Sequence, residues 1–131
     1  MKKTGIMNRE LARLIASLGH TDRIAVVDSG YPIPPSIPSI DLSLRKGYPG
    51  IAETIEEIAK ELEVEGITYA EESDSHCLAL IAEVQAIFPQ AEANRIAHAS
   101  FKELVKESIA VIRTGECIPY SNVILHAGVA F

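Results

Sequence analysis

The hydrophobic positions of this chain alternate between helical and strand-like spacing from one end to the other. After Asn8, leucines and isoleucines recur at the spacing of one helix face, and Gly19 ends that pattern. Similar spacing predicts helices at 51–62 and 74–87, and a capping box at 100–103 predicts the start of a short fourth one. Short apolar runs predict strands at 23–28, 67–71, 93–97, 109–113 and 122–129, and 40–44 fits a short strand or a turn.

This alternation predicts an α/β fold. We expect one domain, residues 1–131, with three α/β/α layers around a central sheet that is mostly parallel or mixed. Residues 29–38 contain four prolines, which exclude regular structure and predict a stiff surface lip after the first strand. Ligands in such folds usually bind at the carboxyl ends of strands, so the loops there are the first candidates for a site.

Composition narrows the class of protein. Of the 131 residues 47% are hydrophobic, which is enough for a buried core and excludes disorder. The formal net charge of −6 repels phosphate backbones and anionic lipid, so we expect no nucleic-acid and no membrane partner. The basic start is followed by no apolar leader segment, and no apolar run is long enough to span a bilayer. Cys77 and Cys117 lie far apart, as expected for reduced thiols in a cytoplasmic protein.

Several common catalytic motifs are absent. The sequence contains no P-loop, no GxGxxG, no GxSxG and no HExxH. It therefore lacks the motifs that ATP-driven, redox and metalloprotease enzymes commonly use. The remaining candidates for a functional site are the four histidines and the polar residues beside the predicted strands.

His20 is the histidine that most suggests catalysis. It follows Gly19 and precedes a predicted strand, so it lies on a connection and not on an apolar face. An imidazole gives and takes protons near physiological pH, and Asp22 is close enough in sequence to orient it. The alternative is a structural imidazole at a helix C-terminus, where the helix dipole favours it. Spacing alone does not separate the two interpretations.

Asp28 ends an apolar strand, where it either holds a substrate hydroxyl or caps the following loop as an Asx turn. His98 lies between a predicted strand and the capping box, and its pattern favours a loop imidazole bonded to the backbone. His76 fits the solvated first turn of a helix. Together with Asp74 it completes no ligand set, so we expect no metal site.

The segment 114–122 joins two predicted strands and ends in Tyr120, Ser121 and Asn122. Their hydroxyl and amide groups both donate and accept hydrogen bonds, which suits a neutral polyol better than a phosphate. On this segment alone, a polar turn is the better explanation of the pattern.

Six segments of the chain form a recognisable set: KK at 2–3, LGHTD at 18–22, DSGYPIP at 28–34, VIRTGE at 111–116, PYSN at 119–122 and AGVAF at 127–131. On these segments the chain resembles the ribose branch of the ribose/fucose mutarotase family. The resemblance extends from residue 2 to residue 131, while residues 50–95 add only their hydrophobic pattern. His126 and Tyr31 are not residues that we associate with this signature.

The resemblance implies a cytoplasmic, cofactor-free and metal-free isomerase that interconverts the pyranose and furanose forms of ribose. It also implies a ring-shaped homodecamer with the sugar bound near subunit contacts. Carried over by motif, His20 is the catalytic proton donor, and Asp28, His98 and Tyr120–Ser121–Asn122 bind substrate.

The chemistry agrees with these residues. Ring opening needs a proton on the ring oxygen and loss of one from the anomeric hydroxyl, which an imidazole and hydrogen-bonding partners can supply. No hydride moves and no carbon–hydrogen bond breaks, so neither a nicotinamide nor a metal is required.

Three alternatives remain at this level. The same chemistry on L-fucose or another aldose differs only in pocket shape. A non-catalytic sugar-binding subunit of a transport system would keep Asp28 and Asn122 without needing His20. A phosphohistidine carrier would place His20 beside cationic groups, and the neighbouring Asp22 argues against it.

Overall fold

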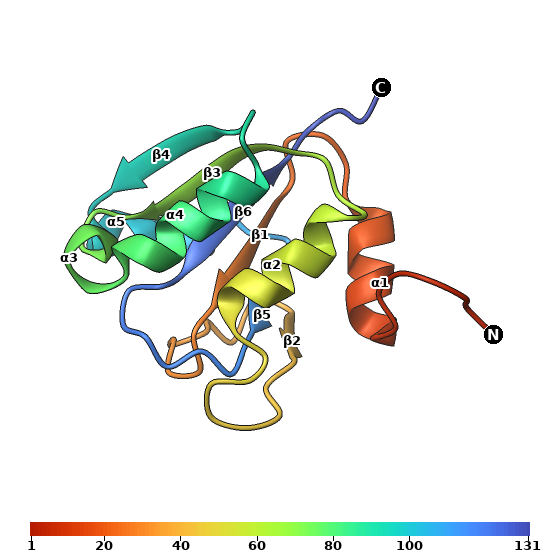
Figure 1. Cartoon of the computed structure of the whole chain (residues 1–131), viewed down its shortest axis with the longest axis horizontal. Coiled ribbons are helices and arrows are strands. Elements are labelled where there is room, and N and C mark those ends of the chain that lie inside the picture. The colour runs from red at the N-terminus through yellow and green to blue at the C-terminus, as the bar shows by residue number, and fades with distance from the viewer.

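A six-stranded sheet forms the centre of the computed structural model, which describes residues 1–131 (Figure 1). The strands are β1 (Arg23–Val27), β2 (Ser39–Asp41), β3 (Val64–Ala70), β4 (Glu92–Ile96), β5 (Ala110–Arg113) and β6 (Val123–Ala127). Their order across the sheet is β2-β5-β1-β6-β3-β4. Only β6 is antiparallel to its neighbours. The carboxyl ends of the other five strands therefore share one edge with the start of β6.

Helices cover both faces of this sheet, which confirms the predicted three-layer α/β/α fold with a mixed sheet. The helices are α1 (Arg9–Ser17), α2 (Ile51–Ala59), α3 (Ser73–His76), α4 (Leu78–Ile87) and α5 (His98–Val105). In Figure 1, α1, α2 and α4 lie in front of the sheet and α5 lies behind it. None of these helices combines the length and apolar character needed to cross a membrane.

The core has two parts because side chains alternate along each strand. In β1, Ile24 and Val26 pack into the larger cluster under α1, α2 and α4, while Ala25 and Val27 pack into the smaller one beside α5. All four side chains are buried, so the strand reads as a continuous apolar run. Burial of each larger side chain contributes roughly 1.5–3 kcal/mol to the stability of the fold. The sheet is therefore a stable scaffold for the loops that follow its strands.

The proline-rich segment 29–38 contains no helix or strand, as its composition predicts. It is fastened to the smaller core by two buried side chains, Tyr31 and Ile37. The Tyr31 ring meets Phe101 of α5 edge-on, with centroids 6.4 Å apart. This packing holds the segment against the sheet edge at which β1 ends.

Three of the predicted helices differ from the observed ones, and the one expected at 51–62 ends at Ala59. The single helix expected at 74–87 is two helices, because the backbone at Cys77 (φ −148°, ψ 37°) leaves the helical region. The predicted helix start with a capping box at Ser100 is wrong, since α5 already begins at His98. The carboxylate of Glu72 instead accepts a hydrogen bond from the His98 N–H, at 3.0 Å.

Two strands also differ from their predicted limits by three residues at one end. β3 begins at Val64, three residues before the expected start, and its pairing with β6 is irregular between Val64 and Gly66. The interruption of the apolar run by Glu65 and Gly66 hid this start. The expected strand or turn at 40–44 is strand only in Ser39–Asp41.

Candidate functional site

A pocket of about 450 Å³ opens at the sheet edge where β1, β4 and β5 end and β6 begins. Four of the six residues predicted to act on a ligand line it, namely Asp28, His98, Tyr120 and Asn122. They come from the loop after β1, the start of α5 and the loop before β6, and the strand order brings these three segments together. A larger hollow of about 740 Å³ lies between the N-terminal segment and α2 and contains none of the predicted residues. We therefore take the smaller pocket as the candidate site.

Asp28 and Asn122 are fixed to one another across this pocket. The Asp28 N–H donates to Oδ1 of Asn122 at 2.8 Å, which leaves the amide NH2 of Asn122 available. Oδ1 of Asp28 accepts from the N–H of Gly30 at 2.9 Å, forming the Asx turn. The turn engages one carboxylate oxygen, so the second remains available to a hydroxyl group in the pocket.

Aromatic rings form another wall. The ring of His98 stacks on Phe101, with centroids 6.3 Å apart, and meets Tyr120 edge-on at 5.0 Å. The ring of His76 also contacts Tyr120, with centroids 4.6 Å apart. Nδ1 of His98 is buried without a hydrogen-bond partner. The prediction that this imidazole is hydrogen-bonded to the backbone is therefore wrong. The ring is held by packing instead.

Ser121 occupies a different position from its neighbours. Its side chain is fully buried, and its hydroxyl donates to the Ile118 carbonyl at 2.8 Å. It does not line the pocket. In this structure the hydroxyl stabilises the turn that presents Tyr120 and Asn122.

Three other residues that line the pocket were not predicted from the sequence. Lys102 lies four residues after His98 on α5, so both face the pocket from one side of that helix. The misplaced helix start concealed this spacing. Glu116 and Cys117 also line the pocket, and the Glu116 carboxylate accepts from the N–H groups of Cys117 (2.9 Å) and Ile118 (3.2 Å).

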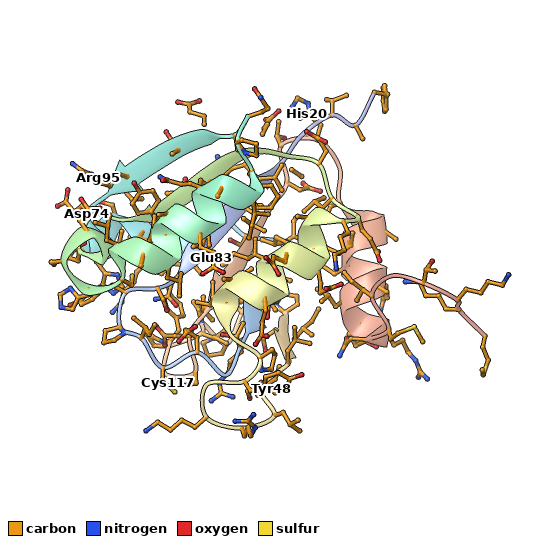
Figure 2. The ribbon with its side chains drawn as sticks, in the orientation of Figure 1. His20, Tyr48, Asp74, Glu83, Arg95 and Cys117 are labelled. Carbon is orange, nitrogen blue, oxygen red and sulfur yellow. The ribbon has the colours of Figure 1, made fainter.

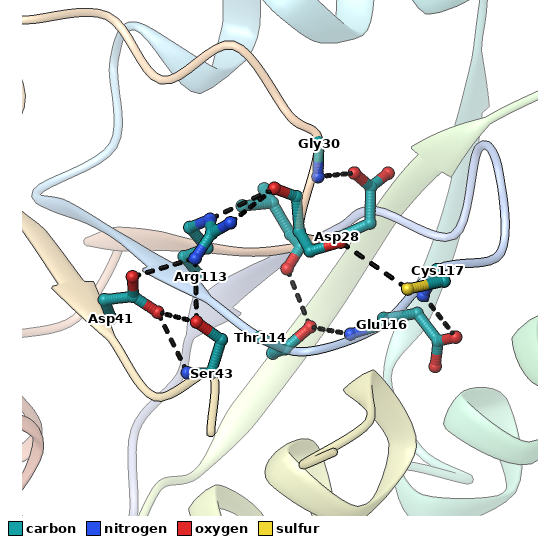
Figure 3. Close-up of polar contacts among 10 residues, drawn as sticks. Asp28, Gly30, Asp41, Ser43, Arg113, Thr114, Glu116 and Cys117 are labelled. Carbon is teal, nitrogen blue, oxygen red and sulfur yellow. Dashed lines mark hydrogen bonds and ion pairs between the residues drawn. The ribbon is translucent and has the colours of Figure 1, made fainter. Parts of the chain in front are cut away.

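Arg113 anchors the loop that follows Asp28 (Figure 3). Its Nε and Nη2 donate to the Ser29 carbonyl at 3.1 and 2.8 Å, and its Nη1 donates to Asp41 and Ser43 at 2.8 and 2.7 Å. A hydrogen bond from the Ser43 hydroxyl lowers the pKa of Asp41, and Arg113 adds to the effect. The loops after β1 and β2 are thus tied to the end of β5.

Tyr31 joins the site from the proline-rich segment. It lines the pocket, and burial together with the nearby Asp28 carboxylate raises its pKa to about 12. Its phenol therefore stays protonated at neutral pH. The pocket contains no group of three or more side chains placed to hold a metal ion, and neither does the rest of the chain.

His20 lies at the opposite edge of the sheet. It precedes β1, whereas Asp28 follows it, and a five-residue strand is about 15 Å long. Figure 2 shows His20 at one end of the molecule and the pocket residue Cys117 at the other. Within one chain, His20 is therefore not brought together with the other predicted residues.

Glu65 of β3 is the partner of His20. Its carboxylate oxygens lie 3.0 and 3.2 Å from Nε2 of a half-exposed ring. The orienting role predicted for Asp22 is wrong, because its carboxylate accepts from the Gly19 N–H at 2.8 Å. No local pattern could reveal Glu65, which lies 45 residues away in sequence.

His126 also lies at this far edge and not in the pocket. It pairs with Arg23 of β1 and Gly66 of β3, and its Nε2 is 2.8 Å from the hydroxyl of Thr68. Burial lowers its pKa, and the Arg23 charge adds to the effect. His126 therefore packs between strands.

Comparison with known proteins gives a consistent result. Residues 1–130 match the model of the RbsD / FucU transport protein family. The chain is 47% identical to a D-ribose pyranase of Bacillus licheniformis and 47% identical to one of Thermosipho africanus. Both alignments cover 100% of this chain and 100% of the relative.

Solved structures agree with the fold. The structure of Bacillus subtilis RbsD complexed with D-ribose matches with a TM-score of 0.96 and 43% identity over 100% of both chains. FucU from Bifidobacterium longum matches with a TM-score of 0.80 over 95% of this chain and 97% of that chain. At 21% identity, the second match shows a shared fold alone.

Proposed function

The chain belongs to the RbsD / FucU transport protein family, and from this premise we propose that it interconverts the pyranose and furanose forms of D-ribose. One observation carries the proposal: similarity over the full length to proteins named D-ribose pyranase, at 47% identity. The polar, uncharged groups of Tyr120 and Asn122 in the pocket suit a sugar without a phosphate.

In the proposed mechanism, His20 delivers a proton to the ring oxygen while the anomeric hydroxyl loses its proton to a hydrogen-bonding acceptor in the pocket. The bond between the anomeric carbon and the ring oxygen breaks, and the sugar opens to its aldehyde. A different hydroxyl then attacks the aldehyde carbon and gives up its proton, the carbonyl oxygen takes one, and the ring closes in the other form. Asp28, His98, Tyr120 and Asn122 bind the hydroxyls, with the free carboxylate oxygen of Asp28 as an acceptor and the Asn122 amide as a donor. Ser121 contributes by holding the turn. Acid–base assistance of this kind commonly supplies about 10²–10⁴-fold.

We infer that the complete site forms between subunits. A single chain holds His20 and the pocket at opposite sheet edges, too far apart to act on one sugar. A neighbouring copy that presents its His20 and Glu65 to the pocket brings both halves together. The separation supports an assembly of several copies, and we propose that this assembly is the homodecamer that the family resemblance implies, acting on ribose in the cytoplasm.

The alternatives fare differently. The Glu65 carboxylate next to His20 would repel a phosphoryl group, so a phosphohistidine carrier is disfavoured. A mutarotase for L-fucose or another aldose would use the same groups. A non-catalytic sugar-binding subunit would leave the pair of His20 and Glu65 without a role.

Exchange NMR on equilibrated D-ribose tests the proposal directly. Addition of the protein, with no cofactor, is expected to accelerate exchange between pyranose and furanose anomeric signals. A parallel sample of L-fucose serves as the specificity control. Saturation transfer to ribose without faster exchange would instead identify a binding protein, and faster exchange on L-fucose alone would reassign the substrate.

A further inference from the structure

Tyr120 holds a backbone conformation that residues with a side chain rarely adopt. Its φ is +59°, in the left-handed region that favours glycine. Such a conformation persists only where the surrounding structure imposes it. In this structure the Tyr120 backbone is held by hydrogen bonds from another segment of the chain.

The carbonyl of Tyr120 accepts two hydrogen bonds from the segment that follows β3. The Ser73 hydroxyl donates at 2.5 Å and the Cys77 thiol at 3.3 Å. Ser73 is 0% exposed, so water does not compete for this contact. Burial raises the pKa of Cys77, which keeps its thiol protonated and able to donate.

The fold explains how these groups meet. β3 pairs with β6, and Tyr69 lies opposite Val123. Ser73 follows that pair by four residues and Tyr120 precedes it by three, so both lie just beyond the same sheet edge. Ser73 begins α3 and Cys77 directly follows its last residue, so the two side chains are four residues apart and donate to the same carbonyl.

We propose that Ser73 is a positioning residue for sugar binding, which holds the Tyr120 backbone in its left-handed conformation and so sets the Tyr120 ring in the pocket. The pocket role of Tyr120 rests on the proposed function. Cys77 is the weaker second donor. The ring position is completed by His76 and His98, which pack against it.

Tyrosine NMR tests the contact without any sugar. The protein has four tyrosines, and ring ¹³C labelling gives each a signal, with that of Tyr120 assigned by its loss in Tyr120→Phe. Ser73→Ala is expected to shift or broaden the Tyr120 signal. Ser108→Ala is the matched control, because Ser108 is also buried, its hydroxyl has no partner, and it precedes β5 at the far sheet edge.

Exchange kinetics on D-ribose test the consequence. Ser73→Ala is expected to raise KM about tenfold with kcat within about twofold, because it disturbs binding and not proton transfer. Ser73→Cys keeps a weaker donor and is expected to fall between Ser73→Ala and wild type, while Ser108→Ala behaves as wild type.

An unchanged Tyr120 signal in Ser73→Ala overturns the proposal, as does a drop in kcat with KM unchanged. If wild-type protein shows no exchange on ribose, the proposed function fails, but the Tyr120 signal still decides whether Ser73 holds Tyr120.

Discussion

At the scale of single residues, Asn122 and Asp28 each have one side-chain oxygen that is already engaged within the protein. Oδ1 of Asn122 is taken by the Asp28 N–H, and Oδ1 of Asp28 by the Gly30 N–H. These bonds fix the orientation of each group and leave one polar atom for a ligand. Preorganisation of this kind lowers the entropy lost on binding.

Replacement of His20 by alanine is expected to lower the exchange rate by about 10²-fold or more, because the proposed proton donor is removed. The ring is half exposed and contacts Glu65 at the protein surface, so the fold should persist. Exchange NMR on D-ribose and circular dichroism measure the two effects. Wild-type exchange rates in the variant would show that His20 is not the acid.

Asn122→Ala removes both an amide donor to the sugar and the acceptor of the Asp28 N–H. We expect sugar affinity to fall about tenfold, in line with roughly 1.4 kcal/mol for lost hydrogen bonds. Titration of D-ribose by calorimetry checks the affinity, and sedimentation checks that the assembly is unchanged. Unaltered affinity would exclude Asn122 from the site.

At the scale of elements, the loops at one sheet edge are tied to one another as well as to the core. Glu72, after β3, accepts from the first N–H of α5, and Arg113, at the end of β5, binds the loop after β1. The pocket is therefore held by contacts between elements that are distant in sequence. This explains why the capping box at Ser100 misled the prediction, since a carboxylate from another loop serves the helix start.

We expect His126, which lies on β6 between β1 and β3, to make the stability of the fold depend on pH. Its folded-state pKa lies below the ordinary value of 6.5, because it is buried and faces Arg23, while Glu65 and Glu92 oppose this effect. As pH falls below about 6.5, the unfolded chain binds a proton first. The stability contribution is therefore fully present above that pH and is lost as pH falls through the folded-state pKa.

His126→Leu is accordingly expected to reduce the loss of unfolding free energy between pH 7 and pH 5, which urea denaturation at several pH values measures. The exposed His76 provides a control as His76→Gln. An equal loss in wild type and His126→Leu would contradict this origin of the pH dependence.

At the scale of the whole molecule, the separation of His20 from the pocket requires a second copy for the proposed chemistry. Sedimentation is expected to give an assembly far above the 14.2 kDa of one chain. A clean monomer at micromolar concentration that still catalyses exchange would contradict a site shared between subunits.

Mixed assemblies test the sharing itself. His20→Ala and Asn122→Ala should each lack normal activity, yet co-assembled at equal ratio they restore about a quarter of the sites, because each site draws one residue from each of two subunits. The control mixes the two proteins after separate assembly, without exchange of subunits. No recovery in co-assembled protein would place all of these residues in one subunit.

The sequence by itself determined the elements and the layers. Periodic burial is a local property, so helices on both faces of a sheet followed from spacing, and the prolines of 29–38 excluded regular structure there. It also indicated which polar residues follow strands, and four of them do meet in one pocket. Motifs then pointed to a sugar isomerase.

Only the tertiary structure decided how these parts meet. The antiparallel β6 in mid-sheet places Asn122 beside Asp28, and the irregular start of β3 places Glu65 beside His20. The buried contact between Ser73 and Tyr120 likewise joins segments 47 residues apart. Strand order and pairing depend on contacts between distant segments, and a local hydrophobic pattern contains no information about which distant segment becomes the neighbour.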